Sequence, residues 1–238
     1  MNSPERIAIE TPAGILAAVA HLPERTPCSV VVCSHGLLSS KDSSKFVSIG
    51  EALSGAGTAA VRFDFSGCGE SRTAAAADLL GTRTRDLLQV LDYVQRQPWA
   101  NGRIGLLGSS LGGLVSLLAA AFHGHGVGAV VCWATPFDLH RLERALAESG
   151  ALQRCFPDVS SLGSPLDLSA LSNIGGVFVI HGRDDDVVPW SDAVAIYRGV
   201  GEPRRLLIME GADHRFLDPA CRAFALKASL EWLRERGF

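Results

Sequence analysis

Gly108-Ser109-Ser110-Leu111-Gly112 stands between an apolar run, residues 104–107, and a stretch rich in small apolar residues, 114–122. The five residues match G-x-S-x-G, and their surroundings are the strand–turn–helix context in which this pattern forms a strained turn. If Ser109 were the central serine, positions 107 and 111 would have to be glycine, but both are leucine. Ser110 is therefore the central serine of the pattern. The pattern predicts that Ser110 is a nucleophile exposed at a helix N-terminus. The alternative is a glycine-rich helix cap without chemistry.

Strand and helix patterns alternate along the rest of the chain. Leu87, Leu91 and Val94 recur at spacings of three and four and predict a helix. Two short alternating runs around Pro12-Ala13-Gly14 predict an N-terminal hairpin. The alternation predicts an α/β fold: one domain over 1–238, with a mainly parallel, twisted sheet covered by helices on both faces. The predicted strands are 7–9, 15–21, 29–33, 59–65, 103–107, 128–135, 177–181 and 205–210, and the predicted helices are 45–55, 82–96, 114–122, 191–197 and 219–236.

One segment, residues 136–171, interrupts this alternation. It contains a predicted helix over 139–148, followed by irregular sequence rich in Ser and Pro. Because so long a segment between two core strands usually has a function, we expect a small lid insertion at about 137–170. The alternative is a surface insertion that touches no substrate. Its apolar residues suggest an acyl pocket, although any small lid needs such residues to pack on a core: Phe137, Leu139, Leu142, Leu146, Leu152 and Phe156.

Composition and charge exclude several classes of protein. Hydrophobic residues make up 47% of the chain and charged residues 20%, which is typical of a globular domain. The formal net charge of -3 gives no reason to expect nucleic acid or an anionic membrane as a partner. Residues 1–11 lack the apolar core of a signal peptide, and we expect a cytoplasmic protein. Arg83 and Arg85, with Arg72 nearby, are interpreted as a solvated helix face.

The sequence indicates neither a metal site nor a cofactor. Its six cysteines form no C-x-x-C pair and have no zinc-site spacing. Gly67 and Gly69 lack the third glycine of a dinucleotide fingerprint, since position 72 is arginine, and no P-loop lysine follows any glycine run. The cysteines are interpreted as buried, reduced thiols: Cys28, Cys33, Cys68, Cys132, Cys155 and Cys221.

A serine hydroxyl becomes a good nucleophile only beside a general base that a carboxylate orients. His214 follows the last predicted strand, where the loop reaches the carboxyl edge of the sheet, and it is predicted to be this base. His181 ends a strand and is expected to pack or hydrogen-bond there. The other histidines after Ser110 are expected at the surface: His123, His125 and His140. For His140, which lies in the predicted lid, contact with the substrate is the alternative.

Asp184, Asp185 and Asp186 follow the preceding strand and supply the carboxylate. Three adjacent carboxylates cannot all point the same way, and spacing alone does not choose among them. A calcium loop is disfavoured because the run lacks the alternating D-x-D-x-D-G pattern.

Five motifs follow one another between Ser34 and His214. They are Ser34-His35-Gly36-Leu37, Asp64-Phe65-Ser66-Gly67-Cys68-Gly69-Glu70-Ser71, Gly108-Ser109-Ser110-Leu111-Gly112-Gly113, His181-Gly182-Arg183-Asp184-Asp185-Asp186-Val187-Val188-Pro189 and Gly211-Ala212-Asp213-His214. In this order they resemble the α/β-hydrolase family, in particular its compact esterases and serine-aminopeptidase-like members, including bacterial cinnamoyl or feruloyl esterases.

The resemblance implies roles that the residues alone do not assign. The family pattern His-Gly-x-x-Asp-x-x-Val-Pro places the catalytic acid on Asp185. The family also implies that the backbone N–H groups of Leu37 and Leu111 form an oxyanion hole, which stabilises the charge of a tetrahedral intermediate. Cys68 is a departure, because histidine often occupies that position in the family, and it leaves the local packing open.

Together these observations predict a serine hydrolase, specifically a carboxylesterase. Ser110, His214 and Asp185 would cleave a small or medium-sized ester-like molecule through an acyl-enzyme, without cofactor or metal, in a monomer or homodimer. Because the fold hosts many reactions, thioester, lactone, peptide or C–C bond cleavage on the same three residues stays open. A ligand-binding protein that kept the fold without catalysis is the alternative from a different class.

Overall fold

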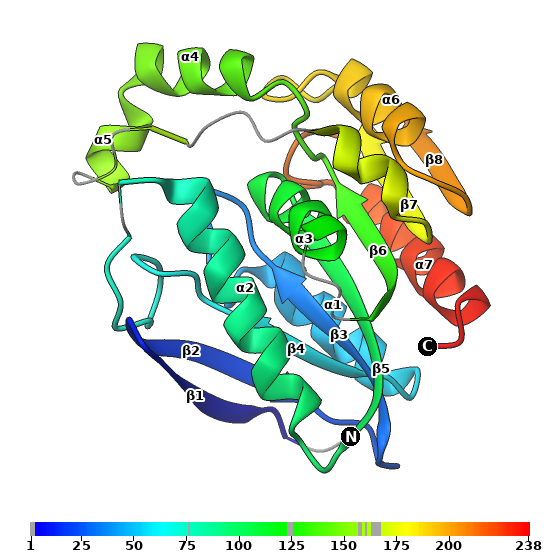
Figure 1. The fold of residues 1–238 in the computed structure, drawn as a ribbon. Coiled ribbons are helices and arrows are strands. Elements are labelled where there is room, and N and C mark those ends of the chain that lie inside the picture. The colour runs from blue at the N-terminus through cyan, green and yellow to red at the C-terminus, as the bar shows by residue number, and fades with distance from the viewer. Residues whose placement is uncertain (1–2, 76, 123–125, 157–158, 160, 163–167) are drawn as a thin grey trace.

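An eight-stranded, mainly parallel sheet organises the chain (Figure 1). The computed structural model describes residues 3–75, 77–122, 126–156, 159, 161–162 and 168–238. The strand order is β1-β2-β4-β3-β5-β6-β7-β8, in which β2 pairs antiparallel with both β1 and β4 and the remaining pairs are parallel. The strands are β1 (Glu5–Thr11), β2 (Gly14–His21), β3 (Cys28–Ser34), β4 (Ala59–Phe63), β5 (Ala100–Ser109), β6 (Val127–Trp133), β7 (Val177–Gly182) and β8 (Arg204–Met209).

Two hydrophobic clusters cover the two faces of the sheet. Successive residues of β3 point to opposite faces, so Val30 and Val32 belong to one cluster and Val31 and Cys33 to the other. The mainly parallel sheet with helices on both faces is therefore confirmed. The first cluster packs under α2 (Leu79–Gln95), α3 (Leu111–Phe122) and α6 (Trp190–Gly199), and the second under α1 (Ser44–Gly55) and α7 (Pro219–Glu235).

Several predicted boundaries move by a few residues. Helix α2 begins at Leu79, three residues before the predicted start, because the Asp78 carboxylate accepts a hydrogen bond from the Gly81 N–H and caps the helix. Helix α3 begins at Leu111, because the turn of the G-x-S-x-G motif ends at Ser110 and Gly112 already lies in the helix. The predicted hairpin is present, with Thr11 opposite Gly14.

The segment after β6 contains two α-helices, α4 (Leu139–Ser149) and α5 (Ala151–Cys155), and a 3-10 helix, η1 (Leu168–Asn173). Helix α4 matches its prediction, and α5 was not predicted. The segment lies beyond the carboxyl end of β6 (Figure 1). Its beginning is tied to α6, because the Asp192 carboxylate accepts hydrogen bonds from the N–H groups of Phe137 and Asp138 and from Arg141. Residues 157–158, 160 and 163–167 of the predicted lid lie outside the described residues.

All six cysteines are free thiols. Cys28, Cys33, Cys68 and Cys132 are buried as expected, and Cys221 is half-buried. Cys155 is exposed, so its predicted burial is wrong: it ends the short helix α5, which the sequence analysis missed.

Candidate active site

Ser110 lies in the turn that links β5 to α3. Its φ of 55° is in the left-handed region, which a residue with a side chain adopts only under constraint. The turn is held by hydrogen bonds from the Ser110 N–H to the Trp133 carbonyl at 2.8 Å and from the Gly113 N–H to the Ser110 carbonyl at 2.9 Å. A side chain at Gly112 would collide with the Ser34 carbonyl, which explains why the motif needs glycine there.

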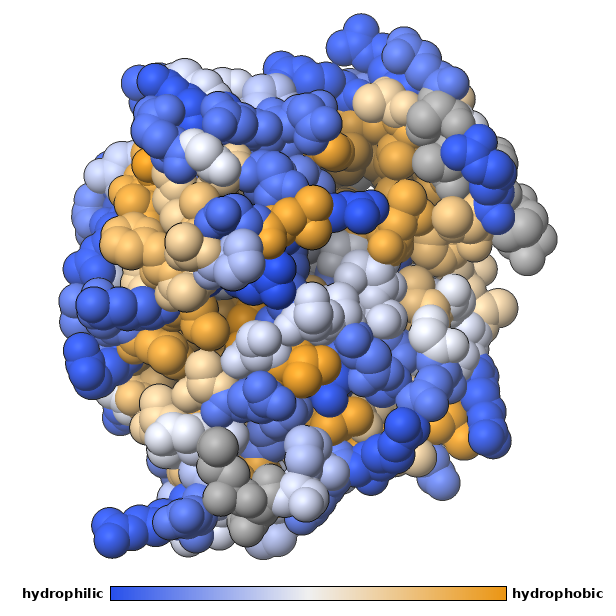
Figure 2. Space-filling view, turned by 180° about the vertical axis from the view of Figure 1, so that it is seen from behind, coloured by the Kyte–Doolittle hydropathy of each residue, from blue (hydrophilic) through white to orange (hydrophobic). Residues whose placement is uncertain are grey.

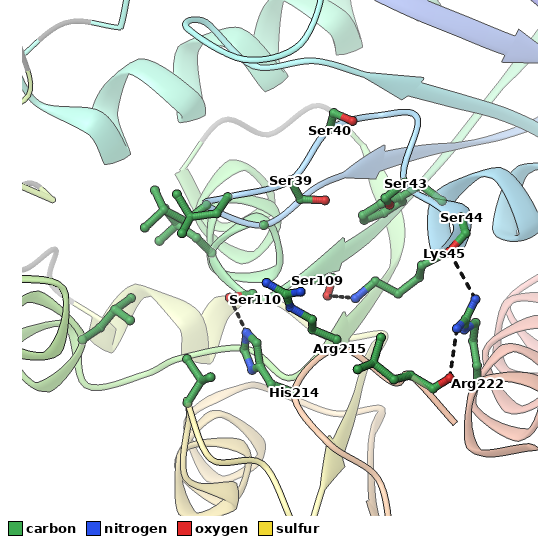
Figure 3. A pocket seen from close by; sticks show the side chains of 18 of the residues that line it. Ser39, Ser40, Ser43, Ser44, Lys45, Ser109, Ser110, His214, Arg215 and Arg222 are labelled. Atoms are coloured by element: carbon green, nitrogen blue, oxygen red, sulfur yellow. Dashed lines mark hydrogen bonds between the residues drawn. The ribbon is translucent and has the colours of Figure 1, made fainter. Parts of the chain in front are cut away.

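His214 joins Ser110 to Asp185. Its Nε2 lies 3.1 Å from the Ser110 Oγ, and its Nδ1 lies 2.9 Å from the Asp185 Oδ2. Because a carboxylate only accepts, Nδ1 carries the proton and donates it to Asp185, so Nε2 is left to accept from the serine hydroxyl. The three predicted residues therefore form one hydrogen-bonded chain across the carboxyl ends of β5, β7 and β8. Figure 3 shows its hydrogen bond between His214 and Ser110.

The structure distinguishes Asp185 from its two neighbours. Asp184 and Asp186 are exposed, whereas the side chain of Asp185 is fully buried. Its Oδ1 accepts hydrogen bonds from the N–H groups of Val187 at 2.9 Å and Val188 at 2.7 Å. Burial alone raises the pKa of Asp185, but hydrogen bonds from His181 and His214, the charge of His214 and the Val188 N–H outweigh it and hold that pKa below its usual range. Asp185 is therefore held as an anion facing His214.

The remaining histidines occupy different environments. His181 is fully buried, and its Nε2 lies 2.9 Å from the Val188 carbonyl and 3.1 Å from the Asp185 Oδ2. Its predicted hydrogen bonding at the strand end is confirmed, but its contact with Asp185 was not foreseen. His140 is exposed as predicted. His123 and His125 lie outside the described residues.

The loop after β3 passes directly beside Ser110. A Cβ placed on Gly36 would lie 3.2 Å from the Ser110 Cβ and 3.8 Å from its Oγ, so this backbone is as close as a glycine allows. Leu37 follows Gly36, and Leu111 follows Ser110; both line the same cavity. Among the described residues, neither leucine N–H donates a hydrogen bond to another group of the chain.

A cavity of about 630 Å³ opens above these groups. In the space-filling view the surface is hollowed below α4, with hydrophobic side chains at the edge nearer that helix (Figure 2). From the predicted lid, Leu142 and Leu146 line this cavity, but Leu139, Leu152 and Phe156 are buried in the core instead. The proposed acyl pocket therefore receives only part of the apolar residues assigned to it. Exposed side chains complete its apolar rim: Leu38, Val187 and Leu217.

Comparison with known proteins places this geometry in a family. Residues 29–149, about half of the chain, match the family described as alpha/beta hydrolase fold. The chain belongs to the α/β-hydrolase family. The resemblance drawn from the five motifs is thereby confirmed at the level of the superfamily.

Named relatives of this α/β hydrolase differ in how they are described. The chain is 31% identical over 168 residues to the uncharacterized protein YfhR of Salmonella typhi, covering 64% of the chain and 53% of that protein. It is 26% identical over 212 residues to the mitochondrial palmitoyl-protein thioesterase ABHD10 of Homo sapiens, covering 78% and 66%. The matches thus span about half to two thirds of these relatives.

Solved structures share the fold. The Est1E structure from Butyrivibrio proteoclasticus with bound ferulic acid superposes with a TM-score of 0.76 at 18% identity, covering 96% of this chain and 99% of the other. The Pyrococcus furiosus esterase PF2001 superposes with a TM-score of 0.82 at 20% identity, covering 98% and 90%. Family membership supports a hydrolase. The solved structures, at 18% and 20% identity, show the fold alone and do not identify the bond cleaved.

Arg83 of this α/β hydrolase is fully buried, so its interpretation as part of a solvated helix face is wrong, whereas Arg72 and Arg85 are exposed. The guanidinium donates to the Gly36 carbonyl at 3.2 Å and to the Leu37 carbonyl at 3.0 Å. It thereby fixes the loop beside Ser110. The signal was present in the sequence: position 83 is one helical turn from both Leu79 and Leu87, on the face that packs on the core.

The surroundings of Arg83 explain the cysteine at position 68. The Cys68 Sγ lies 3.5 Å from an Arg83 nitrogen, and the guanidinium lies 4.8 Å from the centre of the Phe65 ring. A thiol accepts a hydrogen bond in this space, and its small size leaves room for the arginine. The departure from the family pattern is therefore accommodated by the packing around Arg83.

His35 holds the same loop from the other side. Its Nδ1 lies 2.7 Å from the Gly36 carbonyl, and its Nε2 accepts a hydrogen bond from the Phe65 N–H at 3.3 Å. Burial, with the charge of Arg83 adding to it, lowers the pKa of His35 to about 3. His35 is thus a neutral imidazole that braces the loop.

The described part of the chain contains no group of three His, Cys, Asp or Glu side chains arranged to hold a metal ion. None of the helices in the described residues combines the length and apolar character needed to cross a bilayer.

Proposed function

We propose that this protein is a serine carboxylesterase that cleaves a small or medium-sized ester through Ser110, His214 and Asp185. The observation that carries the proposal is the hydrogen-bonded chain from the Ser110 Oγ through both ring nitrogens of His214 to a buried, ionised Asp185. This arrangement supplies a nucleophile, its base and the group that orients the base.

Acylation begins when His214 Nε2 takes the proton from the Ser110 hydroxyl as its Oγ attacks the ester carbonyl. The negative charge that forms on the carbonyl oxygen is stabilised by the N–H groups of Leu37 and Leu111. The imidazolium of His214 is stabilised by Asp185, and it then protonates the departing alcohol. The acyl group is left as an ester of Ser110.

Deacylation repeats these steps with water. His214 Nε2 removes a proton from a water molecule that attacks the Ser110 acyl ester, and the same oxyanion hole binds the second tetrahedral intermediate. His214 returns the proton to the Ser110 Oγ as the carboxylic acid leaves. The α4 segment forms one side of the cavity through Leu142 and Leu146, and we propose that it acts as a lid.

A thioesterase is the second candidate. It is favoured by the 26% identity with a palmitoyl-protein thioesterase, whose matched region covers 78% of this chain. Thioester cleavage would use the same nucleophile, base and oxyanion hole. Cleavage of a lactone, an amide or a C–C bond, and ligand binding without catalysis, have no specific observation in their favour.

Hydrolysis of phenyl butyrate and S-phenyl thiobutyrate separates the two candidates, because these substrates differ in one atom. We expect the ester to be cleaved with a kcat/KM at least equal to that of the thioester. A thioester preference above about tenfold, which corresponds to about 1.4 kcal/mol of transition-state binding, would favour the thioesterase. Failure to cleave either substrate, together with no labelling by a fluorophosphonate, would favour a binding protein.

Arg83→Met is expected to lower kcat on phenyl butyrate by about 10- to 100-fold and to change KM little. Methionine fills the apolar space but leaves the Gly36 and Leu37 carbonyls without their donor, so the loop that presents the Leu37 N–H is less well fixed. Complete removal of an oxyanion donor typically costs about 10²–10³ in kcat, and displacement should cost less.

Arg85→Met makes the same change two residues later on α2, where the side chain is exposed. It is the matched control, and its kcat is expected to stay within about twofold of wild type. An equal loss of kcat in both variants would mean that Arg83 acts only through the stability of α2.

A further inference from the structure

One wall of the cavity carries three cationic side chains beside the nucleophile. They are Lys45 at the beginning of α1, Arg215 in the loop after β8, and Arg222 on α7, and all three line the cavity that contains Ser110. Figure 3 shows Lys45 and Arg215 directed toward Ser109 and Ser110, with Arg222 farther along the wall beside Ser44. We refer to Lys45, Arg215 and Arg222 as the cationic wall.

None of these three cations forms an ion pair with a carboxylate of the described residues. Lys45 Nζ donates to the Ser109 Oγ at 2.7 Å. Arg222 donates to the Phe216 carbonyl at 3.0 Å and to the Leu217 carbonyl at 3.2 Å. The Ser109 hydroxyl and these two carbonyls are all neutral. Lys41 differs from them, because its Nζ contacts three carboxylates, those of Asp42, Asp64 and Glu70. The cationic wall therefore has capacity for an anion that the chain itself does not supply.

The beginning of α1 adds polar groups that also favour an anion. Ser43 and Ser44 line the cavity next to Lys45, and the first turn of the helix contains no acidic residue. The Ser43 side chain does not cap the helix, and its Oγ is buried without a hydrogen-bond partner. The N-terminus of a helix carries a partial positive charge and unpaired N–H groups, which favour an anion.

We propose that the cationic wall binds a carboxylate or phosphate group of the substrate, so that this hydrolase prefers esters carrying an anionic substituent. The inference rests on the proposed function, because it names the substrate class of that same site. The apolar rim around Leu38, Val187 and Leu217 holds the uncharged part of the molecule, and the cationic wall fixes its charged end. The anion then orients the scissile carbonyl toward Ser110.

The charge of Lys45 gives the preference a pH dependence. Burial lowers the pKa of Lys45 to about 8; Arg222 and Arg215 lower it further, whereas Asp213 and Asp185 oppose the shift. His214, the remaining titratable group lining the cavity, serves charged and uncharged esters alike. Lys45 is thus a cation below pH of about 8 and neutral above it. The preference for anionic esters should fall as the pH rises through this range.

Paired esters measure the preference. Monophenyl adipate is compared with phenyl 6-methylheptanoate, in which an uncharged isopropyl group of the same shape replaces the carboxylate. This pair tests an anion on the acyl side. Para-acetoxybenzoate and para-acetoxyphenyl phosphate, each compared with para-tolyl acetate, test a carboxylate and a phosphate on the leaving group. We expect wild type at pH 7 to favour at least one anionic ester by about tenfold or more in kcat/KM. Equal kcat/KM within every pair would overturn the inference while leaving the esterase proposal intact.

Substitutions connect the preference to the cationic wall. Lys45→Met and Arg222→Leu are each expected to reduce the ratio of anionic to uncharged kcat/KM at least fivefold. Lys45→Arg keeps a charge at alkaline pH and should retain the full preference at pH 9, where the preference of wild type is reduced. Lys227→Met removes an exposed cation from α7 outside this cavity and is the matched control, for which the ratio should be unchanged. The same ratio in Lys45→Met as in wild type would exclude Lys45 from anion binding.

Binding to Ser110→Ala separates the two proposals, because it does not depend on turnover. Calorimetry with monomethyl adipate should detect binding that weakens with added salt and with Lys45→Met in the same background. Such binding without hydrolysis of any ester would support the anion site and contradict the esterase. Hydrolysis of uncharged esters with no binding of monomethyl adipate, inorganic phosphate or para-acetoxyphenyl phosphate would support the esterase and contradict the anion site.

Discussion

Ser110→Ala is expected to lower kcat for phenyl ester hydrolysis by about 10⁴-fold or more while the protein stays folded. Without the Oγ no acyl-enzyme can form, and His214 can only activate water directly. Alanine occupies nearly the same space and leaves the hydrogen bonds of the Ser110 N–H and carbonyl in place. Steady-state kinetics on phenyl butyrate measures the loss, and circular dichroism and thermal unfolding verify the fold.

Ser109 offers the matched control for this experiment. Its side chain is buried and donates nothing to His214; instead its Oγ accepts from Lys45. A fluorophosphonate should label wild type and Ser109→Ala on the peptide containing residue 110, and it should not label Ser110→Ala. Equal turnover by wild type and Ser110→Ala would remove the nucleophile assignment, and with it the serine esterase.

Asp185→Asn is expected to lower kcat by about 10³- to 10⁴-fold, the second largest effect. The asparagine amide is isosteric and its oxygen can still accept from the N–H groups of Val187 and Val188. Its NH₂ group, however, donates to His214 Nδ1 and so favours the tautomer with the proton on Nε2. That proton faces the Ser110 Oγ, so the imidazole can no longer accept the serine proton.

The lowered pKa of Asp185 determines the pH dependence expected of wild type, with which Asp185→Asn is compared. A carboxylate whose pKa lies below its usual range stays ionised through the acidic range in which the enzyme is assayed. Activity lost on acidification is therefore not expected to follow protonation of Asp185. In Asp185→Asn, activity should stay low at every pH between 5 and 9, with no recovery at the alkaline end.

Asp184→Asn and Asp186→Asn test the choice among the three adjacent carboxylates. Both side chains are exposed, and both variants are expected to keep kcat within about threefold of wild type. A loss in Asp186→Asn as large as that in Asp185→Asn would mean that the acid is shared or misassigned.

The fold and the three reacting residues were accessible from the sequence because their signals are local. The G-x-S-x-G pattern needs only five residues and its neighbouring strand and helix, and His214 follows a recognisable last strand. Asp185 was separable from Asp184 and Asp186 only by family resemblance. The difference between them is burial and two backbone donors, which depend on how the loop after β7 turns.

Other features arise from contacts between distant segments, and no local pattern encodes them. The spacing in α2 places Arg83 on the buried face, but its two acceptors, the Gly36 and Leu37 carbonyls, belong to the distant loop after β3. The cationic wall combines position 45 with positions 215 and 222, which are separated by most of the chain. Helix α5 was missed because five residues carry too little periodicity to identify a helix.

The position of Leu142 and Leu146 on α4 has a consequence for redesign. Both side chains line the cavity, whereas the same segment is secured to the rest of the molecule by other groups: Leu139, Leu152 and Phe156 in the core, and the Asp192 carboxylate on α6. Leu142 and Leu146 serve both purposes, since they also pack against the first hydrophobic cluster, whereas Leu139, Leu152 and Phe156 do not line the cavity. A combinatorial library at positions 142 and 146 can alter the choice of acyl chain while the anchoring residues stay constant.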